Sequence, residues 1–280
     1  MKVSIVTINY NNADGLRKTL ASVASQTYRD IEHIIIDGGS TDGSVDAIKE
    51  YVAANPDKDP FFKHTIKWIS EKDDGIYNGM NKGIRKATGA YVQILNSGDI
   101  FATPDVVARI VTEIEKSEYP ELLYGNMIKK DYATGKIIGK SKEVEYSLRQ
   151  YYSSTMNHDC CYIRKDVYDM YGLYDENLKI VSDWKWFLQA IGLGKVKPVY
   201  VDIDVTIFDC SGISETNLEL RNKERRQVLE EVLPPAVLSD YDKYSFPIEQ
   251  YNRLKKYHLW PIVYFMERVL FKLNKWKILK

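Results

Sequence analysis

Cysteine is scarce in this chain, which has three in 280 residues: Cys160, Cys161 and Cys210. An odd number without a CxxC pair gives neither a disulfide framework nor the ligand spacing of a zinc site. A reducing compartment is the simplest interpretation, so we expect a cytoplasmic protein. The adjacent Cys160 and Cys161 are expected to be core residues.

Long hydrophobic runs and net charge are also missing. No apolar run reaches about 18 residues, so we expect no transmembrane helix, and the N-terminal apolar stretch is too short for a signal peptide. Lysine plus arginine number 39, as do aspartate plus glutamate, so no global charge favours nucleic acid as a partner. The charge is nevertheless uneven. Residues 251–280 contain eight basic residues and one acid, Glu267, so the rest of the chain carries −7.

The first half alternates β-branched runs with segments of helical periodicity. Four strands are expected there, at residues 3–8, 31–36, 66–69 and 91–95. Helical spacing between them predicts an α/β fold with a mostly parallel central sheet and helices on both faces. Thr103 followed by Pro104 predicts the N-cap and first residue of one more helix, which runs from Asp105 to Glu115.

Loops rich in Asp, Gly and Asn follow all four strands. The carboxyl ends of parallel strands meet at one edge of a sheet, so these loops predict a crevice for a phosphorylated ligand. The strand at 91–95 leads into Asn96, Ser97, Gly98 and Asp99. One carboxylate at a strand end suits Mg²⁺ or Mn²⁺ held partly by substrate phosphates. The alternative is an ordinary turn, because all four residue types favour turns.

The second half differs from the first. Further strands are expected at residues 122–130, 136–140, 160–163 and 199–208, the first two as a hairpin. His158 precedes the third of these strands, and a helix begins near Asp183. A charged helix is expected at 217–232.

Five segments occur in a fixed order: VSIVTIN (3–9), IDGGSTDG (36–43), GIYNGMNKG (75–83), LNSGD (95–99) and SDW (182–184). Together they resemble the family-2 group of inverting glycosyltransferases, which have the GT-A fold, a Rossmann-like nucleotide-diphospho-sugar transferase fold. The resemblance implies a catalytic domain at 1–215, with a nucleotide-sugar-binding half (1–120) and an acceptor-binding half (121–215). A C-terminal helical extension would occupy 216–280.

The resemblance also implies roles for individual residues. The nucleotide sugar, with a UDP-sugar favoured, would be bound by Thr7, Asn9, Asp37, Asp73, Lys82, Asn96 and Ser97. Asp37 would read the base, since a carboxylate accepts a hydrogen bond from a ring N–H. Asp99 matches the last acid of the metal-binding DxD-type motif and implies Mg²⁺ or Mn²⁺. Asp183 matches the catalytic base.

Two positions depart from the family pattern. Gly98 stands where an aspartate is usual, and Met80 stands where many relatives have an arginine. The charge of the diphosphate would then be met by the metal, by Lys82 or by Arg85. Both departures leave the identity of the donor open.

Two assignments have structural alternatives. Asp183 opens a helix, so it could instead be an N-cap with the rings of Trp184 and Trp186 packed beneath it. His158 is placed where some GT-A enzymes have a metal or phosphate ligand, and a structural histidine is the alternative.

The C-terminal stretch at residues 255–280 is apolar and basic. Helical spacing puts Ile262, Phe265, Met266 and Val269 on one face, which favours an in-plane anchor on the inner, anionic face of a membrane. Packing on the catalytic domain and a homodimer contact are the alternatives.

The sequence therefore predicts a metal-assisted inverting glycosyltransferase. It would move a sugar from a nucleotide-diphosphate sugar to a saccharide or lipid-linked acceptor in cell-surface polysaccharide or glycolipid assembly. A nucleotidyltransferase is one alternative, but the first strand is not followed by a glycine- and basic-rich triphosphate loop. A catalytically weak sugar-nucleotide-binding scaffold is the other, favoured by Gly98 and Met80.

Overall fold

The computed structural model describes residues 1–55, 64–131, 134–209 and 217–278. It contains two compact units, Met1–Val228 and Leu229–Lys280. Cys210 and the predicted boundary between residues 215 and 216 lie outside the described residues.

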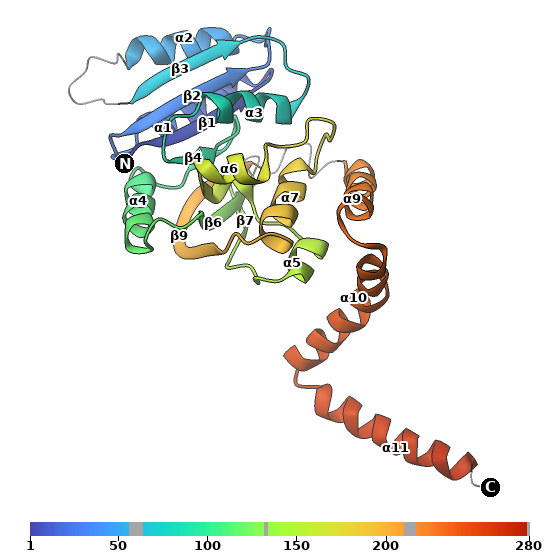
Figure 1. Cartoon of the computed structure of the whole chain (residues 1–280). Helices are drawn as coiled ribbons and strands as arrows, with labels where there is room; N and C mark the ends of the chain where they lie inside the picture. Colours follow the sequence, from blue (N-terminus) through green and yellow to red (C-terminus); the bar gives the residue numbers. More distant parts are fainter. Residues whose placement is uncertain (56–63, 132–133, 210–216, 279–280) are drawn as a thin grey trace. The chain divides into compact units, whose positions relative to one another are not determined.

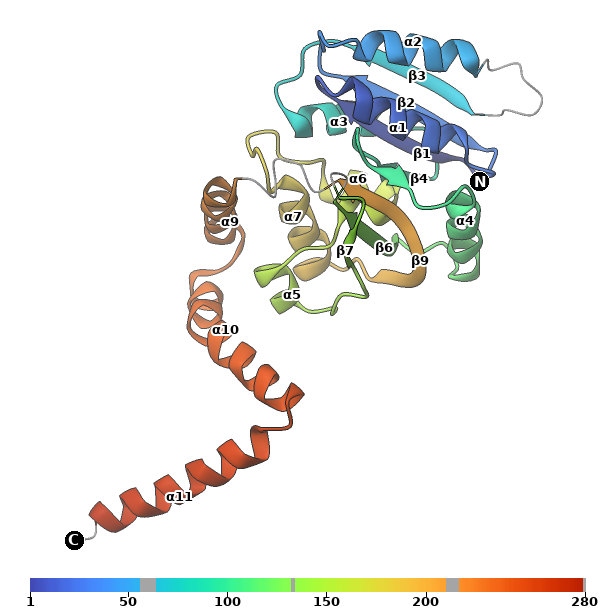
Figure 2. The same ribbon diagram turned by 180° about the vertical axis from the view of Figure 1, so that it is seen from behind.

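The N-terminal part of the first unit alternates strands and helices (Figure 1). Its elements are β1 (Val3–Asn9), α1 (Ala13–Ala24), β2 (Ile31–Asp37), α2 (Ser44–Ala54), β3 (Thr65–Ser70), α3 (Ile76–Lys86) and β4 (Tyr91–Ile94). β1 pairs in parallel with β2 and β4, and β2 pairs in parallel with β3. Helices α1 and α2 cover one face and α3 the other, as the two opposite views show (Figures 1 and 2). The predicted parallel sheet with helices on both faces is confirmed for this part.

Apolar burial explains why these segments form the centre of the sheet. β1 and β2 are buried along their whole length, as expected of parallel strands covered on both faces. Between α1, α2 and the sheet lies a cluster formed by Leu16, Leu20, Ile35, Ile48 and Tyr51. On the other face α3 approaches β1 so closely that a Cβ at Gly83 would lie 2.2 Å from Cγ1 of Val6.

The second half of the first unit continues the same sheet with mixed pairing. Its elements are β5 (Ile100–Phe101), α4 (Val106–Lys116), β6 (Leu122–Lys130), β7 (Ile137–Lys140), α5 (Leu148–Ser153), η1 (His158–Cys160), β8 (Cys161–Arg164), α6 (Lys165–Tyr171), α7 (Ser182–Phe187), η2 (Leu188–Gly192), β9 (Pro198–Asp209) and α9 (Leu218–Val232). β8 runs antiparallel to β4 and β6, while β6 and β9 are parallel. Within the described residues the strand order is β3-β2-β1-β4-β8-β6-β9-β5, and β7 forms the predicted hairpin with β6.

Two local predictions are wrong. Helix α4 begins at Val106 with Asp105 at the N-cap position, and the hydroxyl of Thr103 donates to the Asp105 carboxylate instead of capping the helix. Cys160 belongs to the 3₁₀ turn η1, so the strand starts at Cys161. The carbonyl of Asn157 accepts from both thiols, at 3.2 Å from Sγ of Cys160 and 3.0 Å from Sγ of Cys161. Both cysteines are buried, as predicted.

The second unit contains α10 (Pro235–Lys256) and α11 (Trp260–Ile278), which confirms the predicted C-terminal helix. The rings of Tyr251 and Trp260 meet edge to face, with centroids 4.4 Å apart. Among the described residues, no helix combines the length and the apolar character needed to cross a membrane.

Candidate active site

Three strand ends meet at one edge of the sheet, because Asn9, Asp37 and Ser70 are paired in register at the ends of β1, β2 and β3. The fully buried Asp37 carboxylate accepts from Asn9 Nδ2 at 2.8 Å and from Ser70 Oγ at 2.6 Å. Ser40 donates to it from its backbone N–H at 3.0 Å and from Oγ at 2.6 Å. Burial alone would raise the pKa of Asp37, but these four hydrogen bonds lower it. Asp37 is therefore an ionised acceptor at a fixed position.

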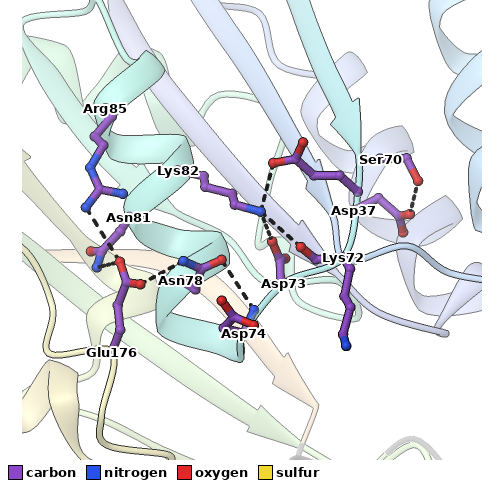
Figure 3. Close-up of polar contacts among 11 residues, drawn as sticks. Asp37, Ser70, Lys72, Asp73, Asp74, Asn78, Asn81, Lys82, Arg85 and Glu176 are labelled. Atoms are coloured by element: carbon purple, nitrogen blue, oxygen red, sulfur yellow. Dashed lines mark hydrogen bonds and ion pairs between the residues drawn. The ribbon is translucent and has the colours of Figure 1, made fainter.

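The loop after β3 brings Asp73 to the same edge. A Cβ at Gly38, directly after β2, would lie 3.3 Å from Oδ2 of Asp73. Lys82 of α3 donates to Oδ1 of Asp73 at 2.6 Å and forms an ion pair with Glu71 at 2.8 Å (Figure 3). Burial alone would lower the pKa of Lys82, but these two carboxylates raise it. Lys82 is thus a charged side chain already engaged by two acids.

The turn after β4 is fixed by the neighbouring elements. The Ser97 N–H donates to the Ile8 carbonyl at 3.0 Å, which ties the turn to β1. Gly98 has φ +107°, a conformation that favours glycine, and its N–H donates to Thr19 Oγ1 at 3.0 Å. The same hydroxyl donates to the Asp99 carbonyl at 2.7 Å. Asp99 is therefore held at the predicted strand end, where it is 4% exposed.

The structure brings Asp183 to this edge through His158. Nδ1 of His158 lies 3.1 Å from Oδ2 of Asp183, and Nε2 lies 3.1 Å from Nδ2 of Asn96. On its other side Asp183 Oδ1 lies 2.9 Å from the hydroxyl of Tyr77, in the first turn of α3. A chain of contacts thus connects the end of β4 to the predicted catalytic base.

His158 and Asp183 form a partly buried ion pair. Burial alone would lower the pKa of His158, but its hydrogen bond and charge interaction with Asp183 raise the pKa to about 9, with smaller contributions from Asp159 and Asp99. Burial alone would raise the pKa of Asp183, yet His158 and then Tyr77 lower it. An imidazolium donates from both ring nitrogens. With its amide turned by 180°, Asn96 accepts from Nε2 through Oδ1, a buried atom that otherwise has no partner within the described residues.

The turn offers oxygen ligands that fit a hard cation. Asp99 and Asn96 lie in one turn, closed by the Asp99 N–H donating to the Asn96 carbonyl at 3.1 Å. A carboxylate and an amide oxygen suit Mg²⁺ or Mn²⁺ when donor phosphates complete the coordination. His158 fits less well, because a ligating histidine must be neutral. In the described part of the chain no three His, Cys, Asp or Glu side chains form a ligand set.

The helix that carries Asp183 leaves the carboxylate available for the site. Val181 holds the N-cap position of α7, so Asp183 is already the second helical residue and the alternative N-cap role is wrong. The rings of Trp184 and Trp186 are buried, as that alternative expected. The Trp184 indole donates to the Tyr151 carbonyl at 2.6 Å, which anchors α7 to α5.

Other predicted residues lie away from this group or have partners of their own. The hydroxyl of Thr7 is buried against His33 Nε2 at 3.0 Å, inside the sheet and two residues short of the end of β1. The side chain of Met80 is 1% exposed. Arg85 forms an ion pair with Glu176 at 3.5 Å. The nucleotide-binding roles of Thr7 and Lys82 stay predictions.

Sequence reasoning missed the polar residues of α3 that reach the second half of the site. Tyr77, Asn78 and Asn81 contact Glu176, Asp183 or the backbone near them. The YNGMNKG run at residues 77–83 was the pattern that could have indicated them, but within it only Lys82 was predicted to bind the donor. Glu176 had no recognisable pattern around it.

The chain was compared with known families and proteins. The sequence profile described as "Glycosyl transferase family 2" matches residues 4–172. An uncharacterized glycosyltransferase of Mycobacterium tuberculosis is 32% identical over 217 residues, which cover 75% of this chain and 76% of that protein. A PGL/p-HBAD biosynthesis glycosyltransferase of Mycobacterium bovis is 25% identical over 214 residues, which cover 76% of this chain and 79% of that protein.

Solved structures share the fold at low identity. S. aureus TarS 1-349 in complex with UDP-GlcNAc has a TM-score of 0.65 at 17% identity, over 85% of this chain and 69% of that chain. The chain spans 41% of the longer TarS structure. Mannosyltransferase PcManGT from Pyrobaculum calidifontis, in complex with GDP-Man and Mn²⁺, has a TM-score of 0.62 at 16% identity, over 86% and 69% of the two chains. These neighbours confirm the predicted GT-A fold.

Proposed function

The chain belongs to Glycosyl transferase family 2, and on that premise we propose that it transfers a sugar with inversion from a nucleotide-diphosphate sugar to an acceptor hydroxyl. The observation that carries the proposal is the partly buried carboxylate of Asp183, connected through His158 to Asn96 in the turn after β4. An inverting transfer needs a base on one side of the sugar and stabilisation of the leaving diphosphate on the other. Asp183 would be the base on one side, and Asp99 would hold the cation that stabilises the leaving diphosphate on the other.

The roles follow from single in-line displacement. Asp183 takes the proton of the acceptor hydroxyl while the acceptor oxygen bonds to the anomeric carbon and the bond from that carbon to the phosphate oxygen breaks. His158 and Tyr77 hold the carboxylate in one orientation. Asp99 and Asn96 would hold a divalent cation. When bound, such a cation neutralises the charge of the leaving diphosphate.

Donor binding is assigned to the edge formed by the other strand ends. Asp37 and Asp73 would bind the nucleoside, and Asn9 presents a buried Oδ1 that has no hydrogen-bond partner in the described part of the chain. Structural neighbours were solved with UDP-GlcNAc, UDP and GDP-Man, which supports a sugar nucleotide as donor. A UDP-sugar is our first choice.

A thermal-shift screen of UDP-, GDP-, dTDP- and CMP-sugars, each with and without Mn²⁺, tests donor binding. A ligand that binds the native state raises the melting temperature by mass action. We expect one nucleotide family to stabilise the protein in a Mn²⁺-dependent way, and Asp183→Asn to keep that shift while losing turnover. Binding without turnover in the unsubstituted protein would favour the scaffold function, the alternative that rests on Gly98 and Met80 as departures from the family pattern.

For the acceptor we propose a lipid-linked saccharide, used at a membrane surface. The mycobacterial relative named for PGL/p-HBAD biosynthesis supports a role in glycolipid assembly. In the second unit, large apolar side chains of α11 are exposed: Ile262, Val263, Tyr264, Phe265, Met266, Val269, Leu270 and Phe271. An exposed apolar helix within a segment that carries eight basic residues and one acid matches an anionic lipid surface.

Full-length Phe265→Glu/Phe271→Glu tests the attachment, with Met170→Glu on α6 as a control at another exposed apolar side chain. We expect the unsubstituted protein and the control to sediment with phosphatidylglycerol vesicles more than with phosphatidylcholine vesicles, and the double variant to stay in solution. A lipid-free homodimer that the double substitution dissociates, without vesicle binding, would assign this helix to dimerisation instead.

A further inference from the structure

Helix α3 lies directly against the donor side of the site. A Cβ at Gly79 would lie 2.9 Å from Oδ2 of Asp73, and a Cβ at Gly83 would lie 2.2 Å from Cγ1 of Val6 on β1. The two glycines are one helical turn apart, so they form one face of α3. This face fixes the distance between α3, β1 and Asp73.

The opposite face of α3 contacts the segment that leads to Asp183. Tyr77 and Asn81 are also one turn apart and lie on this face. The hydroxyl of Tyr77 is buried within 2.6 Å of the Ile180 carbonyl and 2.9 Å of Asp183 Oδ1. Burial raises the pKa of Tyr77, and the charge of Asp183 raises it further, so the hydroxyl stays protonated and acts as a donor. Its single proton is shared between two acceptors, the carboxylate and the backbone carbonyl just before it.

Asn81 clamps the same segment by its backbone. Its amide donates to the Tyr174 carbonyl at 2.8 Å and accepts from the Tyr174 N–H at 3.0 Å. The second hydrogen of the Asn81 amide is donated to Glu176 Oε1, at 2.7 Å. Asn78 also donates to Glu176, at 2.7 Å, as the close-up of α3 shows (Figure 3). Asn81 is 1% exposed, so water does not compete for these hydrogen bonds.

We propose that α3 positions the Asp183 carboxylate against the donor site, with Tyr77 holding the carboxylate and Asn81 holding the segment before it. This inference rests on the proposed role of Asp183 as base. Tyr77 and Asn81 are positioning residues. Through the glycine face, the same helix fixes the Asp73 side, so one rigid element sets the geometry of donor and base together.

Tyr77→Phe removes only the hydroxyl, and Tyr162→Phe is the matched control, because Tyr162 is fully buried and its hydroxyl has no hydrogen-bond partner among the described residues. The assay is release of nucleoside diphosphate from the sugar nucleotide selected by the screen, together with calorimetric titration of that nucleotide. A hydrogen bond to a charged group lost in the transition state corresponds to roughly a tenfold to hundredfold effect. We expect kcat of Tyr77→Phe to fall by that factor with donor Kd within about twofold, while Tyr162→Phe keeps both.

Asn81→Asp combined with Glu176→Gln provides a rescue. The single change Asn81→Asp replaces the donating amide by a carboxylate beside that of Glu176, and we expect kcat to fall. In the double variant the glutamine amide can donate to the new carboxylate, and kcat should recover in part. Should Asn81→Asp fail to fold, Tyr77→Phe alone decides.

Two results would overturn the positioning role. One is a Tyr77→Phe enzyme with the kcat of the Tyr162→Phe control, and the other is a loss of donor affinity equal to the loss of kcat. Asp183→Asn separates this failure from that of the proposed function. If Asp183→Asn turns over normally, both ideas fail, because no base is left to position. If it is inactive and Tyr77→Phe is normal, only the positioning role fails.

Discussion

Replacing His158 by glutamine should change how the stability of the protein depends on pH. The side chain of His158 is 19% exposed and paired with Asp183 at 3.1 Å. This environment raises the pKa from 6.5 to about 9. At 1.36 kcal/mol per unit the rise corresponds to roughly 3 kcal/mol of stability, an upper limit because part of the side chain meets solvent.

The direction of the effect follows from the raised pKa. The folded state holds the proton more tightly than the unfolded state, so the contribution is fully present below the unfolded value and is lost as the pH rises through about 9. His158→Gln cannot titrate. The free energy of unfolding of the unsubstituted protein should therefore exceed that of the variant most at about pH 6, and the difference should shrink by at most roughly 3 kcal/mol by about pH 10.

Urea denaturation followed by circular dichroism across this pH range measures the difference, and other groups that titrate there cancel between the two proteins. His258→Gln is the control, because His258 is exposed on the surface. Its curve should run parallel to that of the unsubstituted protein. A His158→Gln curve that is also parallel, displaced by a constant amount at every pH, would refute the ion pair.

Two further predictions concern the turn after β4 and the seat of α3. Asp99→Ala should abolish the Mn²⁺-dependent part of the donor-induced thermal shift, and an unchanged shift would contradict the metal assignment. Gly83→Ala should lower the free energy of unfolding by about 1–3 kcal/mol, because the new Cβ would lie 2.2 Å from Val6 Cγ1 and the core must yield. Chemical denaturation checks this. Gly139→Ala is a suitable control, because the nearest atom to the new Cβ would be 3.9 Å away. Gly135→Ala is unsuitable, because Gly135 has φ +70°.

The sequence predicted the donor half of the fold well because its signals are local. β-branched runs gave β1 to β4, and Asp or Gly after each run marked the strand ends that the register of Asn9, Asp37 and Ser70 now brings together. The errors were local too. Thr103 has the residue type of an N-cap, but its hydroxyl donates to Asp105, and no propensity scale contains that competing hydrogen bond.

The second half of the site depends on contacts that span long stretches of chain. Asn96 meets His158 across 62 residues, and Tyr77 meets Asp183 across 106. No spacing rule connects such residues, because they are brought together by the antiparallel pairing of β4 with β8 and by the packing of α3. The SDW motif predicted Asp183 through its resemblance to the family. Nothing in the sequence indicated that His158 and Tyr77 hold the carboxylate from two sides.

The charges of the site support the need for a cation with the donor. Asp37 and Asp183 have lowered pKa values, so both are ionised near neutral pH, and Asp99 is held at the same edge. Two of the positive side chains nearby are already paired with acids, His158 with Asp183 and Lys82 with Asp73. A diphosphate would add negative charge at this edge of the sheet, where a low local dielectric makes repulsion between like charges strong. A divalent ion at Asp99, if the proposed metal site is right, would offset that repulsion, so the proposal predicts that donor affinity depends more steeply on Mn²⁺ than on monovalent salt.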